Sequence, residues 1–177
     1  MVALDLHPPI ARALLSAAAI AAALIVTVSH AAFGSTFKVG SIVIETPWSR
    51  ATPGGAKVGV GYLTIKNDGA TPDRLVSATT AIAGRTEIHL MSMDDGVMKM
   101  RPVADGVPVP ANGSLVLGPN SYHLMFMDLA RQLKQGEQFP AALVFEHAGT
   151  VDVTFDVEAI GAAAPRAAGH DHDSAHH

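Results

Sequence analysis

Methionine and histidine side chains gather in one region of this sequence at a regular spacing. Apart from Met1, all six methionines lie between positions 89 and 127, and so do two histidines. Residues two apart on a β-strand point to the same face, so each group would present imidazole or thioether side chains on one side of a strand. The three groups, each with a spacing of two, are His89-Leu90-Met91-Ser92-Met93, Met98-Lys99-Met100 and His123-Leu124-Met125-Phe126-Met127.

The residues between the first two groups predict how these groups pair. Asp95-Gly96 between strand-like segments is typical of a two-residue hairpin turn. His89 would then lie diagonally from Met100, within reach of long side chains, and His123 with Met125 could complete the same patch from a third strand. The expected cross-strand pairs are Asp94 with Val97, Met93 with Met98, and Met91 with Met100.

A patch of thioether and imidazole groups has the chemistry of a site for monovalent copper. Thioether is a soft ligand that selects Cu(I), and imidazole accepts copper as well, whereas zinc sites are built from Cys, His and carboxylates. The alternative is simple packing, because methionine is a common gap-filler in apolar cores. Core packing would, however, bury His89 and His123, which need hydrogen-bond partners, and would leave Leu124 and Phe126 facing the other way. The sequence therefore favours a carrier site for Cu(I).

The composition excludes several other kinds of site. The 177 residues include no cysteine, which excludes disulfides, thiolate catalysis, Cys zinc sites, iron–sulfur clusters and the His₂Cys blue-copper site. It also excludes a bacterial lipoprotein anchor, because that lipid is attached to a cysteine. The formal net charge of −4 and the lack of a basic patch argue against nucleic acid as a partner. No Ser-His-Asp order, pair of catalytic carboxylates or phosphate loop is evident, so we expect no enzymatic activity.

Short apolar segments between turn signals predict a single β domain over residues 32–160. Short strands separated by Gly, Pro, Asn and Asp are typical of an antiparallel sandwich or barrel. Helix should be scarce, because apolar residues never keep helical spacing for three turns; Leu129–Gly136 could make a single turn. The predicted strands are Val39–Ile44, Val58–Lys66, Arg74–Ala78, Thr86–Met93, Val97–Val103, Ser114–Leu117, Tyr122–Met127, Ala141–His147 and Val151–Ala159.

Residues 1–31 have the layout of a secretory signal peptide. Arg12 precedes the uncharged apolar segment 13–28, and Ser29-His30-Ala31 has small residues at the two positions that a signal peptidase reads. The alternative is an uncleaved membrane anchor, but a spanning helix needs about 20 apolar residues, and seven of these sixteen are alanine. We expect cleavage near Ala31 and a mature protein that works outside the cytoplasm without a stable membrane span.

The last segment, residues 161–177, differs from the rest in composition. It is rich in small residues and should be disordered, because such a composition cannot bury a core. Imidazoles interleaved with aspartates suit Cu(II) or Zn²⁺ rather than Cu(I). The alternatives are an inert tail or the remnant of a purification tag, but a tag is usually an unbroken histidine run. The predicted tail ligands are His170, His172, His176 and His177.

Several of these segments together resemble a known family, the periplasmic copper chaperones called PCu(A)C. The resemblance rests on Glu87-Ile88-His89, the segment 96–103 and Tyr122-His123-Leu124-Met125. Ten residues separate His89 from Met100 and twenty-two separate Met100 from His123, and His-x-Met then closes the motif. The matches Trp48-Ser49-Arg50, Gly61-Tyr62-Leu63 and Asn67 support the resemblance, which spans residues 36–160.

The resemblance implies a fold, a site and a role. The fold would be a cupredoxin-like Greek-key β-sandwich, holding one Cu(I) through His89, Met100, His123 and Met125. The role would be to supply copper to the Cu-A centre of cytochrome c oxidase, alone or with a Sco-type protein. Four further methionines outside the motif could form an outer shell, a hand-off path or a cover for the site: Met91, Met93, Met98 and Met127.

Two other functions share part of this sequence pattern. A periplasmic copper-storage or resistance protein would use the same ligands but retain the metal. A β-sandwich interaction module would use the methionines only for packing. Outside the motif, Trp48 and Tyr62 are expected to anchor the core, and His147 is expected in a solvated hairpin loop.

Overall fold

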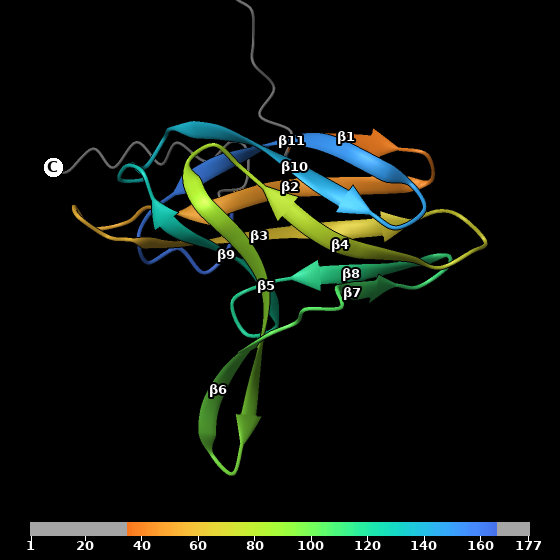
Figure 1. The fold of residues 1–177 in the computed structure, drawn as a ribbon, viewed down its shortest axis with the longest axis horizontal. Helices are drawn as coiled ribbons and strands as arrows, with labels where there is room; N and C mark the ends of the chain where they lie inside the picture. The colour runs from red at the N-terminus through yellow and green to blue at the C-terminus, as the bar shows by residue number, and fades with distance from the viewer. Residues whose placement is uncertain (1–34, 166–177) are drawn as a thin grey trace, which may run out of the picture. The chain divides into compact units, whose positions relative to one another are not determined.

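The computed structural model describes residues 35–165. The predicted signal peptide, residues 1–31, lies outside the described residues, as do His170, His172, His176 and His177 of the predicted tail. Within residues 35–165 every regular element is a β-strand (Figure 1). No helix in this part of the chain is long and apolar enough to cross a membrane.

Eleven strands make up the described domain, and all nine segments predicted as strands lie within or overlap them. The bounds are β1 Thr36–Val39, β2 Ile42–Arg50, β3 Val58–Asn67, β4 Asp73–Thr79, β5 Ala83–Asp94, β6 Val97–Pro102, β7 Val107–Val109, β8 Gly113–Leu117, β9 Tyr122–Leu129, β10 Gln138–Phe145 and β11 Gly149–Glu158. The segment between β9 and β10 contains no helical turn.

The strands form one mixed sheet in the order β6-β5-β9-β8-β3-β2-β11-β10-β4-β7, with β1 paired to β2 and an additional pairing of β9 with β3. Most neighbours are antiparallel, as the sequence predicts, but β11 lies parallel to β2 and β8 lies parallel to β9. Strand β6 is at one edge of this order, so the hairpin β5–β6 has a free side. Figure 1 shows this hairpin extending away from the rest of the sheet.

The core is centred on three phenylalanine rings that come from different strands. Phe126 of β9 meets Phe139 of β10 and Phe155 of β11 edge to face, with centroids 5.4 and 5.7 Å apart, and Phe139 stacks on Phe155 at 5.3 Å. Gly61 of β3 lies directly against this cluster: a Cβ atom there would be 2.7 Å from Phe126 Cζ. The lack of a side chain at Gly61 therefore lets Phe126 approach the backbone of β3.

Strand β2 differs from its prediction. The sequence predicts one strand over Val39–Ile44, but the chain turns at Gly40-Ser41 between β1 and β2. Strand β2 then continues past Thr46-Pro47 to Arg50, through an irregularity in its pairing with β3 between Glu45 and Trp48. Thr46 has a φ of 50°, so the strand bulges at Thr46-Pro47 instead of ending there. A proline normally signals the end of a strand, but Pro47 is accommodated in this bulge.

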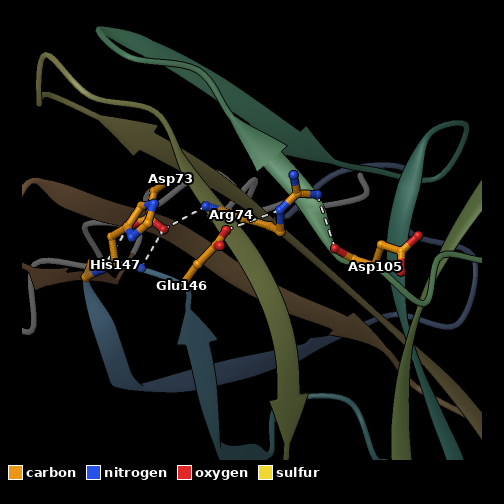
Figure 2. A network of polar contacts seen from close by, with 6 residues as sticks. Asp73, Arg74, Asp105, Glu146 and His147 are labelled. Carbon is orange, nitrogen blue, oxygen red and sulfur yellow. Dashed lines mark hydrogen bonds and ion pairs between the residues drawn. The ribbon is translucent and has the colours of Figure 1, made fainter.

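A buried carboxylate joins β4 to the turn between β10 and β11 (Figure 2). Asp73 accepts hydrogen bonds from the backbone N–H groups of Arg74 (2.7 Å), His147 (3.0 Å) and Ala148 (2.9 Å). Burial raises the pKa of Asp73, but the three N–H donors outweigh burial and hold the pKa below its usual value. Arg74 extends this network to Glu146 and to the carbonyl of Asp105. The His147 side chain is exposed in this turn, as expected.

Candidate metal centre

The β5–β6 hairpin has the register that its sequence predicts. Its turn is Asp95-Gly96, whose φ angles of 50° and 76° are both positive, as a type I′ turn requires. Cross-strand partners lie on the same face of a sheet, so His89 and the four methionines of the hairpin share one face. The observed pairs include Asp94 with Val97, Met93 with Met98, and Met91 with Met100.

The third strand of the site is β9, which pairs antiparallel with β5. In this ladder His89 lies opposite His123, and Glu87 lies opposite Met125. Met100 on β6 is diagonal to His89, because its direct partner Met91 is two residues further along β5. The four residues of the motif therefore occupy one face of three adjacent strands, β6, β5 and β9. Their backbone positions bring them together as the sequence predicts.

Burial changes along this face from the body of the domain to the hairpin. His123 is 2% exposed and the His89 side chain is 12% exposed. Met125 is half-buried, whereas Met100 is 47% exposed. The site thus lies where the hairpin leaves the body of the sheet, with its histidines inside and one methionine accessible.

Each histidine ring has one nitrogen held by a hydrogen bond and one buried nitrogen without a partner. His89 Nε2 donates to the Glu87 carboxylate at 2.8 Å, and His123 Nδ1 donates to the Ser121 carbonyl oxygen at 3.2 Å. Both partners only accept, so the proton belongs on these nitrogens and a lone pair remains on His89 Nδ1 and His123 Nε2. Among the described residues, these two atoms and Thr86 Oγ1 are the buried polar side-chain atoms with no hydrogen bond.

This arrangement suits a metal ion better than it suits packing. The two rings are 6.0 Å apart between centroids, and their unpartnered nitrogens have lone pairs, as metal-bound imidazole requires. Burial, with a smaller contribution from the charge that His89 can carry, lowers the pKa of His123 below its usual value. The His123 ring is therefore neutral near pH 7 and ready to bind a soft cation.

Glu87 is a site residue whose role the sequence alone does not define. Its carboxylate accepts from His89 and also from Arg85 Nε at 2.8 Å, and Arg85 in turn pairs with Asp128 at 3.0 Å. These two hydrogen bonds, from His89 first and Arg85 second, lower the pKa of Glu87. An ionised Glu87 fixes the tautomer of His89 and adds negative charge beside the site. The spacing Glu-x-His on one strand face is the signal that could have found it.

Trp48 and Tyr62 are buried, as expected, although neither ring joins the phenylalanine cluster. They form an aromatic row on the other face of the sheet, with centroids 4.6 Å apart. Tyr62 lies 6.5 Å from the His123 ring, and the Arg50 guanidinium lies 5.6 Å from the Tyr62 centroid. The bulge in β2 explains why Trp48 lies on this face, because a bulge changes the face to which the following residues point. This row supports the buried side of His123.

The remaining methionines divide into two groups. Met91, Met93 and Met98 are on the hairpin, beyond the two histidines. Met127 is on β9, two residues past Met125 and opposite Val58 of β3. Only the hairpin group extends the site, because Met127 lies on the far side of Met125 from His123.

Comparison with known proteins identifies the family. The family model described as "Putative lipoprotein LpqE-like" matches residues 42–157. The chain belongs to the LpqE-like family, which is the PCuAC family. This confirms the resemblance that the His–Met motif indicates. The 177 residues of this LpqE-like chain contain no cysteine.

Relatives of this LpqE-like chain include one sequence and several solved structures. It is 26% identical over 117 residues to "Putative lipoprotein Lxx21020" of Leifsonia xyli subsp. xyli, covering 66% of this chain and 69% of the relative. It is 27% identical to the structure titled "Copper-bound PCuAC domain from PmoF2", with a TM-score of 0.60, covering 71% of this chain and 98% of that one. The solution structure of CuI-DR1885 from Deinococcus radiodurans is 28% identical, with a TM-score of 0.51 and coverages of 73% and 85%. The fold is therefore the expected cupredoxin-like β fold.

Proposed function

We propose that this protein is a copper chaperone that binds one Cu(I) outside the cytoplasm and passes it to another protein. The observation that carries this proposal is the pair His89 and His123, which lie opposite each other with one buried lone pair on each ring. Two imidazoles and thioethers form a soft donor set that suits Cu(I). Two of the similar solved structures hold copper, one of them as Cu(I).

The proposed ligands are His89 Nδ1, His123 Nε2 and the sulfur atoms of Met100 and Met125. Met125 follows His123 on the same face of β9, and Met100 approaches His89 diagonally from β6. Methionine has three rotatable bonds and a polarizable sulfur, so both side chains can adapt to an ion between the strands. Glu87 and the Ser121 carbonyl would hold the two rings in their metal-binding tautomers.

Transfer, rather than storage, is favoured by how the site is exposed. Met100 lies on the edge strand β6 and is half exposed, while His123 is buried and the His89 side chain is only 12% exposed. An acceptor could therefore replace the outer thioether first without opening the fold. We propose the Cu-A domain of cytochrome c oxidase, directly or through a Sco-type protein, as the acceptor and the periplasm as the location; the motif and the predicted signal peptide support both.

The ligand set is tested by Cu(I) competition with a chromophoric chelator. Met100→Leu and Met125→Leu should each weaken Cu(I) binding sharply, while the similar volume of leucine keeps the stability change below about 1.5 kcal/mol. Met127→Leu is the matched control and should bind Cu(I) like the wild type. Unchanged affinity in both site variants would remove these methionines from the site.

The chaperone role is tested separately by transfer. The Cu(I)-loaded protein is mixed with an apo Cu-A domain, and metal in each partner is measured after separation. Transfer that approaches equilibrium within minutes supports a chaperone. Copper that stays on this protein, although the acceptor has the higher affinity, would instead indicate storage.

A further inference from the structure

The β5–β6 hairpin carries more thioether groups than the proposed site uses. Met91 faces Met100 across the two strands, and Met93 faces Met98 next to the turn. All four lie on the face that His89 shares. Of these four methionines, only Met100 is a proposed ligand of the His89–His123 site, so that site does not account for Met91, Met93 and Met98.

Packing does not explain the two methionines next to the turn. Met93 is 65% exposed and Met98 is 57% exposed, and neither belongs to the buried core cluster. Figure 1 shows the hairpin extending away from the sheet, where the other strands do not cover it. A long apolar side chain at such a position loses contact with water only if something binds there.

The geometry of the ribbon brings three sulfur atoms within reach of one ion. Directly opposite residues have Cβ atoms about 4.5–5.5 Å apart, and diagonal neighbours about 7–8 Å. Met93 and Met98 are directly opposite, and Met91 is diagonal to Met98 on the same face. Flexible thioethers at these separations can converge on a single soft cation.

The charges of the hairpin do not oppose a cation at this place. Lys99 alternates with Met98 and Met100, so it belongs to the opposite face of β6, and its ammonium pairs with the Asp94 carboxylate. Asp95 adds a carboxylate at the turn itself. The methionine face of the turn end is therefore apolar and free of neighbouring positive charge.

We propose that Met91, Met93 and Met98 form a second metal site, selective for a soft monovalent ion such as Cu(I), at the end of the β5–β6 hairpin. This site goes beyond the proposed function, because none of the three residues is a ligand of the His89–His123 site. Its donor set contains only thioethers, which do not titrate. Met100 lies between the two sites and adjoins both.

The test follows individual methionine methyl groups by NMR in the full chain. The protein is labelled with ¹³C at the methionine methyls and titrated with Cu(I), added as its acetonitrile complex without oxygen. The predicted tail contains no methionine, so metal bound there does not move these signals. We expect two separate steps in the titration, each of one equivalent of Cu(I). The Met125 methyl should shift in one step, and the Met93 and Met98 methyls should shift in the other.

The decisive variant is Met93→Leu combined with Met98→Leu, with Met127→Leu as the control. The double variant should bind one Cu(I) fewer, while the affinity reported by Met125 stays within about threefold, as expected for weakly coupled sites. Met127→Leu should retain both equivalents.

Three outcomes separate the possibilities. If the Met93 and Met98 methyls do not move at any ratio, the second site does not exist. If they move together with Met125 in one step, there is a single site, and the second site is also ruled out. If they move while Met125 does not, the hairpin site stands and the proposed His89–His123 site fails.

Discussion

His89 on β5 lies directly opposite His123 on β9, with ring centroids 6.0 Å apart, and each ring has one buried nitrogen without a hydrogen-bond partner. The other nitrogen of each ring is held by an acceptor, a carboxylate for His89 and a backbone carbonyl for His123. Two such lone pairs side by side are costly in an apolar setting unless a cation or a water binds them.

Loss of the Glu87 carboxylate should weaken metal binding although Glu87 is not a ligand. Glu87→Ala removes the acceptor that keeps the proton on His89 Nε2, and we expect a loss of Cu(I) affinity of about 10- to 100-fold. Glu87→Gln should have a smaller effect, because the amide oxygen still accepts this hydrogen bond. ¹⁵N NMR of the His89 ring should show a mixture of tautomers in the alanine variant only.

The control for Glu87 is Asp128→Asn. It removes the other carboxylate partner of Arg85 without touching His89, so Cu(I) affinity should stay at the wild-type value. Equal affinities for Glu87→Ala and the wild type would show that the Glu87–His89 hydrogen bond does not organise the site.

Lowering the pH should weaken Cu(I) binding less than it would weaken binding to a site made of two histidines with ordinary pKa values. Burial lowers the pKa of His123 below its usual value, so protons compete for its nitrogen only at lower pH than for a free imidazole. The thioether ligands do not titrate. Between pH 7 and pH 5, log Kd should therefore change by clearly less than two per pH unit, measured by chelator competition. A change in log Kd of two per pH unit across this whole range would contradict the contribution of thioether ligands to the site.

The buried carboxylate of Asp73 should stabilise the fold above pH 4 and lose this effect in acid. Its pKa is lowered in the folded protein, so its contribution is present above the unfolded value of about 3.9 and is lost as the pH falls through the folded value. Asp73→Asn keeps the shape but turns a donor toward backbone N–H groups. We expect a loss of about 1–3 kcal/mol in the free energy of unfolding at pH 7.

Urea unfolding at pH 7 and at pH 3 measures this effect. The difference between the wild type and Asp73→Asn should shrink at pH 3, because the wild-type carboxyl is then partly protonated. Asp152, an exposed residue of β11, is the control: Asp152→Asn should change the stability by less than about 0.5 kcal/mol. A difference that is the same at both pH values would show that the charge of Asp73 is unimportant.

The histidine-rich tail should form a second class of sites that prefers Cu(II). Arg50 Nε donates to the carbonyl of Ala162 at 2.7 Å, so a deletion of residues 166–177 leaves this contact in place. The truncated protein should lose Cu(II) binding and keep its Cu(I) affinity, because imidazole and carboxylate groups are harder ligands than thioethers. Isothermal titration calorimetry with Cu(II) and with Cu(I) measures the expected loss and the expected retention. Full Cu(II) binding after truncation would show that these histidines are not ligands.

The sequence by itself determined the local features of the site. The spacing of two places His89 and the hairpin methionines on one face, and Asp95-Gly96 sets the pairs Met93–Met98 and Met91–Met100, both confirmed by the observed register. These features depend only on the pleat of a strand and on the backbone angles that a short turn requires. Neighbouring residues are therefore enough to encode them.

The tertiary structure decided how distant segments meet. His89 and His123 are 34 positions apart in the sequence, and no local pattern states that β5 pairs with β9 in the register that places them opposite each other. The position of Trp48 is likewise not local: it packs beside Tyr62, on the face of His123, because β2 bulges and continues past Thr46-Pro47. Pairing between distant strands is selected by the burial of the whole core, here the Phe126, Phe139 and Phe155 cluster, and that packing is settled only when all strands are in place.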